Sequence, residues 1–325
     1  MSFFSIAQRY HARKCAVIGC SGVGSAVAHA ISQCSFIDQL VLIDPNQRAS
    51  DGLAADLSCA LPIGVSMDLW SGEYSDLGDC SLIVLVLGHG YLHESAHADL
   101  IELNLPIIRT AIANITSHAQ DACIVVLSRP CEIMTYAVLR YAGLPQYKVM
   151  GVGTLAQTLY LRKILGKYLG VDARQLEAMI IGQSDTHGIL SPGSMRVCGT
   201  RIEDYLGANG RSYDAAMLQS FYDDTLHAFE RAEDASGCAQ YAIAQACTLI
   251  LNCILADTNT ILPICTAADT LGDVAQCCLS LPCTVGRHGA HPLPDIFLTS
   301  TEHEQLRRSA ARLHAQMLDA EQILS

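Results

Sequence analysis

A glycine-rich turn followed by an acid is the clearest constellation in the sequence that could bind a ligand. Glycines let a chain turn tightly and approach a pyrophosphate, and the free N–H groups at the start of the next helix stabilise its charge. Asp44 follows Gly24 by 20 residues, a spacing that lets the acid accept hydrogen bonds from an adenosine ribose and that favours NAD over NADP. The residues predicted to hold this dinucleotide are Gly19, Ser21, Gly22, Val23, Gly24, Asp44 and Gly88.

A serine occupies the middle position of this turn. Ser21 stands where the pattern has its second glycine, and Gly22 adds a glycine that the pattern does not require. Backbone and pyrophosphate come closest at that second position. Two interpretations therefore stay open: a working dinucleotide site, and a fold that has stopped binding its dinucleotide.

The elements that must position the turn alternate between strand and helix. Apolar runs predict buried strands over 15–18, 40–43, 82–87 and 123–127. Helical spacing predicts helices over 23–34, 49–60 and 132–142, and one that ends near 115. This alternation predicts an α/β protein with a doubly wound parallel sheet, whose ligands bind at the carboxyl ends of the strands.

The second half of the chain has a different organisation. Helices are predicted over 154–169, 213–229 and 239–255, and a strand over 178–181. The last helix has a predicted capping box, Thr301 with Glu304, and an apolar stripe formed by Leu306, Ala310, Leu313 and Met317. We expect a Rossmann-type domain over 1–150 and an α+β domain over 151–325.

Composition argues against several classes of partner. Half of the 325 residues are hydrophobic, which is ample for sizeable cores. The formal charge of −12 argues against binding to nucleic acid or to an anionic membrane surface. The longest apolar runs are strand-sized, well short of the roughly 20 residues of a membrane span, and residues 1–13 do not resemble a targeting signal.

The cysteine pattern bears on the cellular compartment. The sequence has 15 cysteines, an odd number, and contains no C-x-x-C. Most of them stand inside apolar runs, which is typical of cysteine used as a small core side chain in a reducing compartment. The sequence therefore predicts a cytoplasmic protein.

Segments in register along the chain resemble the NAD-dependent lactate/malate dehydrogenase family. They are VIGCSGVGSAVA, LVLID, AADLSCA, IVLVLG, PCEIMTYAVL, GVGTLAQTLYLRKILGKYLGVD, IIGQ and CLSLPCTVGRHG. The resemblance covers nearly the whole chain and implies a small-molecule substrate and a homo-oligomer, a dimer or a tetramer. It also implies that the second domain supplies a relay histidine with an aspartate partner, and that arginines hold the substrate carboxylate.

The positions that carry this chemistry in the family hold other residues here. The family's asparagine after the fourth strand corresponds to Arg129, the aspartate partner to Gln157, and a carboxylate-binding arginine to Tyr160. An ungapped match places Ser184 at the relay histidine. Gln157 has no charge to hold an imidazolium, and Tyr160 has none to hold a carboxylate. We therefore do not expect ordinary lactate or malate turnover.

Further replacements fall in loops. After Gly88, the mobile-loop arginine of the family corresponds to His97, and the substrate-discriminating position to Tyr91. His187 lies three residues beyond Ser184. A local shift of that loop would bring His187, with its neighbouring acid, into the relay role; without the shift it is a plain loop histidine.

Histidines 89, 93 and 97 recur at steps of four in the loop after the third predicted strand. On a helix they would share one face and could bind a metal. The matching family loop is mobile and no fourth ligand is evident apart from Glu94 or Asp99, so no metal site is predicted.

The sequence predicts an NAD-dependent oxidoreductase that transfers hydride to a carbonyl or imine other than a simple 2-oxo acid. The predicted pocket residues are Tyr91, His97, Arg129, Gln157, Tyr160, Ser184 and His187. Arg129 either binds an anion or forms a structural salt bridge, and Tyr160 either donates a proton or fills volume. The alternative is a catalytically retired dinucleotide-binding sensor or interaction protein. The lost relay favours that alternative, whereas new polar groups at the vacated positions favour the enzyme.

Overall fold

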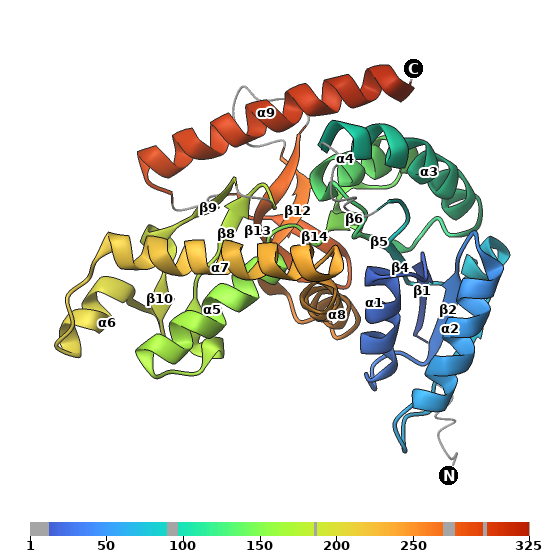
Figure 1. Ribbon diagram of the computed structural model, residues 1–325, viewed down its shortest axis with the longest axis horizontal. Helices are drawn as coiled ribbons and strands as arrows, with labels where there is room; N and C mark the ends of the chain where they lie inside the picture. Colours follow the sequence, from blue (N-terminus) through green and yellow to red (C-terminus); the bar gives the residue numbers. More distant parts are fainter. Residues whose placement is uncertain (1–12, 90–96, 185–186, 269–276, 295–297, 325) are drawn as a thin grey trace, which may run out of the picture.

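A computed structural model describes residues 13–89, 97–184, 187–268, 277–294 and 298–324 of the chain (Figure 1). The strands of its first half are β1 (Lys14–Ile18), β2 (Gln39–Ile43), β3 (Asp68–Ser71), β4 (Leu82–Leu85), β5 (Cys123–Val126) and β6 (Val149–Gly151). The helices between them are α1 (Val23–Ser32), α2 (Gln47–Ala60), α3 (His97–His118) and α4 (Cys131–Ala142).

These strands confirm the predicted Rossmann-type sheet. They run parallel in the order β3-β2-β1-β4-β5-β6. Every residue of β1, β4 and β5 is buried, as expected for parallel strands that helices cover on both faces. The strand order reverses direction between β1 and β4, and such a switch point is where doubly wound sheets bind ligands.

The second half extends the same sheet with antiparallel strands. The strands that extend it are β8 (Ile180–Gly182), β9 (Gly188–Leu190), β12 (Thr260–Ala267), β13 (Cys278–Gly286) and β14 (Gly289–Pro292), while β7 (Leu176–Glu177), β10 (Arg196–Val197) and β11 (Thr200–Arg201) form a separate small sheet. β12 pairs with β6 through Cys265 and Gly151, and β13 then pairs with β12, β8 and β14. One sheet thus runs through both halves, and the division into 1–150 and 151–325 stays a prediction.

The helices of the second half are α5 (Leu155–Leu169), α6 (Ile202–Ala208), α7 (Ala215–Ser236), α8 (Gln240–Leu255) and α9 (Ser300–Leu324). Gly237, in the left-handed conformation with φ of 77°, ends α7, and α8 leaves the break at 116° to it. Among the described residues, no single helix is long and apolar enough to span a membrane. The bent pair of α7 and α8 would be long and apolar enough only if its two helices were taken together.

The last helix, α9, lies along both halves of the molecule (Figure 1) and contacts α3, α4, β8 and β13. Its predicted stripe is confirmed, because Leu306, Ala310, Leu313 and Met317 are all buried. The predicted capping box was wrong by two residues. The backbone N–H of Thr299 donates to Glu302, and that of Glu302 donates to the Thr299 hydroxyl.

The cysteines serve mainly as core side chains. All 15 are free thiols, and most are buried. Cys15, Cys247 and Cys265, for example, have no exposed surface. Burial of small side chains of this kind contributes to the apolar core as the sequence predicted.

Candidate functional site

The glycine turn after β1 has the close packing of a dinucleotide-binding turn. Gly19 has φ of 104°, and a Cβ there would lie 2.5 Å from the carbonyl oxygen of Val86. A Cβ on Gly24 would overlap the carbonyl oxygen of Gly19, so only glycine lets α1 pack this tightly against the turn. Gly22 has φ of 51°, and a Cβ there would meet no described atom within 4 Å. The turn is therefore closely packed at Gly19 and Gly24 and open at Gly22.

Asp44 follows β2 and lies against the same turn. Its Oδ2 accepts a hydrogen bond of 2.7 Å from the backbone N–H of Cys20, and its Oδ1 accepts one of 2.8 Å from that of Asn46. These bonds fix the carboxylate, which is only half-buried. Each carboxylate oxygen can accept more than one hydrogen bond, so the group can still receive ribose hydroxyls. The residues present thus fit an NAD ribose.

A cavity of about 260 Å³ adjoins the turn and is called the outer cavity here. It is lined by the turn, by the ends of β4 and β5, and by the break between α7 and α8, with Ser21, Gly22, Val23, Gly88, His89, Arg129, Cys238 and Gln240 among its residues. Ser21 is exposed at this cavity, while its carbonyl oxygen accepts from the N–H of Gly24 at 2.9 Å. The cavity stands at the switch point of the sheet, as expected for a nicotinamide site.

A buried asparagine joins the strand ends that form this cavity. Asn104 has no exposed surface, and its Nδ2 donates to the carbonyl oxygens of His89 at 3.0 Å and Arg129 at 2.8 Å. Its Oδ1 accepts from the His89 N–H at 2.6 Å. A Cβ on Gly88, which has φ of 117°, would lie 2.6 Å from that oxygen. Local sequence patterns identify neither Asn104 nor His89 as a cavity residue, because these contacts exist only once α3 lies against the loops that follow β4 and β5.

A smaller cavity of about 60 Å³, called the inner cavity here, has Arg129 in common with the outer one. It is lined by Leu127, Arg129, Cys131, Val152, Gly153, Ala156, Gln157, Ser184, Phe229, Glu233 and Ile243. Three of the predicted pocket residues, Arg129, Gln157 and Ser184, are thus brought together. Its aliphatic and aromatic lining admits only a small group.

Arg129 forms an ion pair with a carboxylate of the second half. Its Nη1 lies 2.9 Å from Oε1 of Glu233 on α7, and both side chains are about a quarter exposed, at 23% and 29%. The same nitrogen lies 3.9 Å from Sγ of Cys238. Glu233 is 104 residues away in the sequence, so no local pattern could have identified it.

A second carboxylate, that of Glu132, holds Ser184 in place at the inner cavity. Glu132 on α4 is only 3% exposed. It accepts hydrogen bonds from the backbone N–H of Ser184 at 2.7 Å and from the Ser184 hydroxyl at 3.1 Å. Nε2 of Gln157 donates to the Ser184 carbonyl oxygen at 3.1 Å. Ser184 is therefore held on both sides, and its hydroxyl proton already points to a carboxylate.

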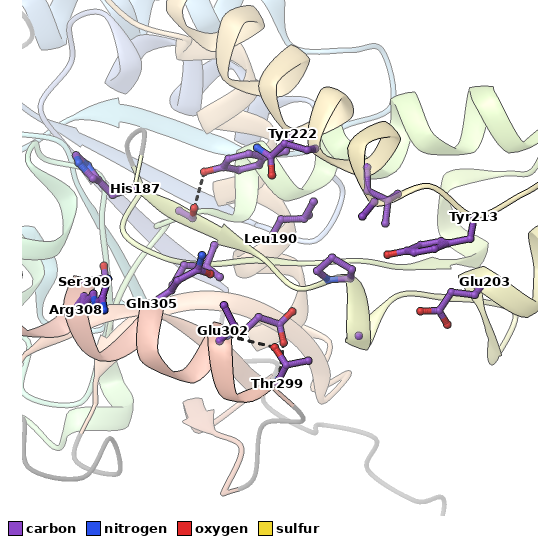
Figure 2. Close-up of a pocket in the computed structure, with 18 of the residues that line it drawn as sticks. His187, Leu190, Glu203, Tyr213, Tyr222, Thr299, Glu302, Gln305, Arg308 and Ser309 are labelled. Atoms are coloured by element: carbon purple, nitrogen blue, oxygen red, sulfur yellow. Dashed lines mark hydrogen bonds between the residues drawn. The ribbon is translucent and has the colours of Figure 1, made fainter.

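Two predicted residues lie away from both cavities. The ring of Tyr160 packs edge-on against Phe229, with centroids 6.4 Å apart, and Tyr160 lines neither cavity. His187 lines a separate pocket of about 690 Å³ between β9, α7 and α9 (Figure 2). In that pocket the Tyr222 hydroxyl donates to the Gly188 carbonyl oxygen at 2.6 Å (Figure 2).

The predicted loop positions are only partly described. Tyr91 lies outside the described residues, and His97 is described only as the first residue of α3. No group of three or more His, Cys, Asp or Glu side chains within the described part of the chain is placed to hold a metal ion.

The thiols beside the outer cavity are poor nucleophiles. Burial raises the pKa of Cys20 to about 12, and the nearby Asp44 carboxylate contributes to this rise. Burial also raises the pKa of Cys238, although Arg129 opposes this effect. Since the thiolate is the reactive form, covalent catalysis through either cysteine is disfavoured, and hydride chemistry fits the site better.

Comparison with known proteins agrees with this geometry. The family model of the lactate/malate dehydrogenase NAD-binding domain matches residues 13–151, and that of the alpha/beta C-terminal domain matches residues 158–323. L-lactate dehydrogenase of Clostridium botulinum (strain 657) is 28% identical over 300 residues, covering 92% of this chain and 94% of that protein. L-lactate dehydrogenase of Clostridium perfringens (strain 13) is 27% identical over 313 residues, covering 96% and 99%.

Solved structures are similar over the same length. A lactate dehydrogenase, MGS-M5, from a Medee basin deep-sea metagenome library has a TM-score of 0.89 at 27% identity and covers 95% of this chain and 99% of its own. The minor L-lactate dehydrogenase from Enterococcus mundtii, in a ligand-bound form, has a TM-score of 0.89 at 27% identity, with 94% and 98% covered. The chain therefore belongs to the lactate/malate dehydrogenase family and is an NAD-binding oxidoreductase of that type.

Proposed function

We propose that this oxidoreductase acts on a carbonyl or imine compound that is not a simple 2-oxo acid. The observation that carries the proposal is the ion pair of Arg129 with Glu233, at 2.9 Å. Among the described residues, Arg129 is the only arginine or lysine that lines either cavity. A 2-oxo acid needs a cation that is available for its carboxylate, and here the guanidinium already has a carboxylate partner.

The proton chemistry supports the same proposal. No histidine among the described residues lines the inner cavity, and the Ser184 hydroxyl donates to Glu132. A serine whose proton is already shared with a carboxylate is a poor general acid. When bound, reduced NAD supplies the hydride. The protein then has to position the two reactants: the glycine turn and Asp44 hold the dinucleotide, and the inner cavity orients the acceptor carbon.

The proposal is tested first by cofactor binding. We expect saturable NADH binding, followed by nicotinamide fluorescence, and weaker binding of NADPH. Asp44→Ala should weaken NADH binding roughly tenfold to a hundredfold, because hydrogen bonds to charged groups contribute about 1.5–3 kcal/mol. Asp56→Ala, at an exposed position on α2, is the matched control and should bind as the parent protein does.

Substrate screening then separates the two candidate functions. Reduction of ketones or imines in preference to pyruvate and oxaloacetate, read by NADH absorbance, would support the enzyme. NADH binding without hydride transfer to any compound would support the retired dinucleotide-binding sensor. Two observations favour that alternative: the Arg129 guanidinium is already paired with a carboxylate, and no histidine among the described residues lines the inner cavity. Preferential pyruvate reduction would overturn the proposal.

We also propose a cytoplasmic homo-oligomer, a dimer or tetramer, as the family resemblance implies. The free state of all 15 cysteines supports a reducing compartment. Exposed apolar side chains support an interface, for example Tyr241 at 75% and Ile261 at 44% exposure. Light scattering after size-exclusion chromatography tests the assembly, and a clean monomer would contradict it.

A further inference from the structure

One side-chain oxygen at the inner cavity has no hydrogen-bond donor among the described residues. The Ser184 carbonyl oxygen can only accept, so the amide nitrogen of Gln157 must face it, at 3.1 Å. This fixes the orientation of the amide and leaves its oxygen, Oε1, as the other end. That oxygen is buried and has no hydrogen-bond partner among the described residues, and Gln157 is only 7% exposed. A ligand that donates a hydrogen bond would satisfy it.

The charges around the cavity point to the same kind of ligand. Glu233 lines the cavity and shares Oε1 with Arg129, which leaves its second oxygen to accept. Glu132 lies behind Ser184 and accepts from both its N–H and its hydroxyl, so both of its oxygens act as acceptors there. Two carboxylates thus accompany one guanidinium, and an anionic ligand is disfavoured relative to a cationic one.

The apolar part of the lining suits a compact organic cation. The Phe229 ring lines the cavity together with Ile243 and Val152, and an aromatic face attracts a cation that lies over it. About 60 Å³ is room for only a few heavy atoms. A small ring or short alkyl group with one charged nitrogen matches this combination.

We infer that the substrate is a protonated imine, a small iminium cation without a carboxylate, whose N–H donates to Gln157 Oε1 and whose positive charge lies beside the Glu233 carboxylate. The inference rests on the proposed function and narrows it from carbonyl or imine to iminium. Its distinctive feature is that the substrate itself carries the proton that a ketone would have to obtain from the protein.

The reaction balances without a protein acid. Hydride from the reduced nicotinamide forms a new C–H bond at the iminium carbon, and the π electron pair of the C=N bond moves onto nitrogen. The iminium is thereby reduced to a neutral amine and the nicotinamide is oxidised. The proton on nitrogen stays there throughout, so Gln157 and Ser184 can occupy the positions of a histidine–aspartate relay with no loss of function.

Binding alone gives a test that does not depend on turnover. Pyrrolidinium, the protonated form of a product amine, and cyclopentanol, a neutral hydrogen-bond donor that also has a five-membered ring, are titrated by calorimetry into the NADH-saturated protein. We expect pyrrolidinium to bind and cyclopentanol to bind at least about tenfold more weakly, because charge-assisted hydrogen bonds are roughly twice as strong as neutral ones. Equal affinities would overturn the inference.

Variants assign the recognition to the named groups. Gln157→Leu and Glu233→Gln should each weaken pyrrolidinium binding about tenfold, while NADH binding is retained. Glu230→Gln removes an exposed carboxylate from the same helix, outside both cavities, and should leave both ligands unaffected. Loss of pyrrolidinium binding in Glu230→Gln to the same extent would mean that net charge, not this cavity, recognises the cation.

Kinetics test the source of the proton. With NADH, 2-methyl-1-pyrroline should be reduced faster as the pH falls and its iminium form accumulates, whereas the permanently charged 1,2-dimethyl-1-pyrrolinium should show no such rise. Cyclopentanone should be reduced far more slowly than 2-methyl-1-pyrroline at low pH, and 1,2-dimethyl-1-pyrrolinium, which keeps the charge but has no N–H, should fall between the two. Faster reduction of cyclopentanone would overturn the iminium inference and leave the proposed function standing. Reduction of none of the three, with NADH bound, would overturn the inference, and a failure that extends to all ketones and imines would overturn the proposed function too.

Discussion

The guanidinium of Arg129 lies 2.9 Å from the carboxylate of Glu233 at the junction of the outer and inner cavities. Arg129 follows β5 and Glu233 lies on α7, so the pair also joins the two halves of the chain across the site. Both side chains are partly exposed, and the pair contributes little to stability, about 1 kcal/mol or less, because solvent screens it. The pair therefore affects the charge of the ligand that the site can bind more than it affects the stability of the fold.

Glu233→Gln should convert the site toward anions. Removal of the carboxylate takes away the ion pair with Glu233 that competes with a ligand carboxylate at Arg129, and a bidentate pair with the ligand is worth at least about 1.4 kcal/mol, a tenfold change in affinity. Oxamate, an analogue of a 2-oxo acid, should therefore bind the NADH complex at least tenfold more tightly. Calorimetry measures this change, with Glu230→Gln as control. Unchanged oxamate affinity would show that Arg129 does not face the ligand.

Gly24→Ala should destabilise the protein because its Cβ would overlap the Gly19 carbonyl oxygen. Overpacking of this kind costs about 1–3 kcal/mol, and the displaced turn should also lose NADH affinity. Gly52→Ala on α2 is the matched control: nothing described lies within 4 Å of its Cβ, and a helical alanine should stabilise by about 0.5–1 kcal/mol. Urea unfolding compares the two. Equal effects would show that the close contact at Gly24 is easily relieved.

Ser21→Gly should strengthen NADH binding by a few-fold. Ser21 is exposed at the outer cavity, where backbone and pyrophosphate come closest in turns of this type. Removal of its side chain frees space for the phosphates at the cost of a more flexible turn. Fluorescence titration measures the change, and Ser58→Ala on the exposed side of α2 is the control. Weaker binding in Ser21→Gly would mean that the hydroxyl itself contacts the ligand.

Alkylation should distinguish the thiols by their burial. With a pKa of about 12, Cys20 has a thiolate fraction at pH 8 of roughly one in ten thousand. Its reaction with iodoacetamide should accelerate only as the pH rises toward that value. Cys59 and Cys198 are exposed and should be modified first, as mass spectrometry of peptides would record, with NADH binding retained. Early modification of Cys20 would contradict its burial beside Asp44.

Local patterns predicted the dinucleotide half of the site. The closest approach to Gly24, from the Gly19 carbonyl oxygen, and the hydrogen bond of Asp44 with Cys20 both lie within one strand–turn–helix–strand unit. Contacts between units could not be predicted in this way. Glu132 lies 52 residues from Ser184, and Glu233 lies 104 residues from Arg129, so only the packing of α4 on the sheet and of α7 against α5 reveals them.

The failures of local patterns have equally specific causes. A threonine precedes a glutamate by three residues both at Thr299 and at Thr301, and only the path of the chain into α9 selects Thr299. His187 is near Ser184 in sequence, but it lies just before β9 and lines the pocket beside α7 and α9 (Figure 2). Of the two alternatives for His187, this position favours a plain loop histidine over the relay role.

Restoring the family's groups should create 2-oxo acid reduction, and changing Glu233 too should increase it strongly. Five substitutions together supply the groups that the resemblance implies, the relay and the carboxylate-binding cations among them: Ser184→His, Gln157→Asp, Tyr160→Arg, His97→Arg and Arg129→Asn. Arg129→Asn, however, removes the partner of Glu233 and leaves a carboxylate that repels an anionic substrate. We therefore expect pyruvate or oxaloacetate turnover in this variant with Glu233→Gln added, and much less without it. Equal turnover in the two would show that Glu233 does not govern ligand charge, and no turnover in a folded, NADH-binding protein would count against the mapping of Ser184 to the relay position.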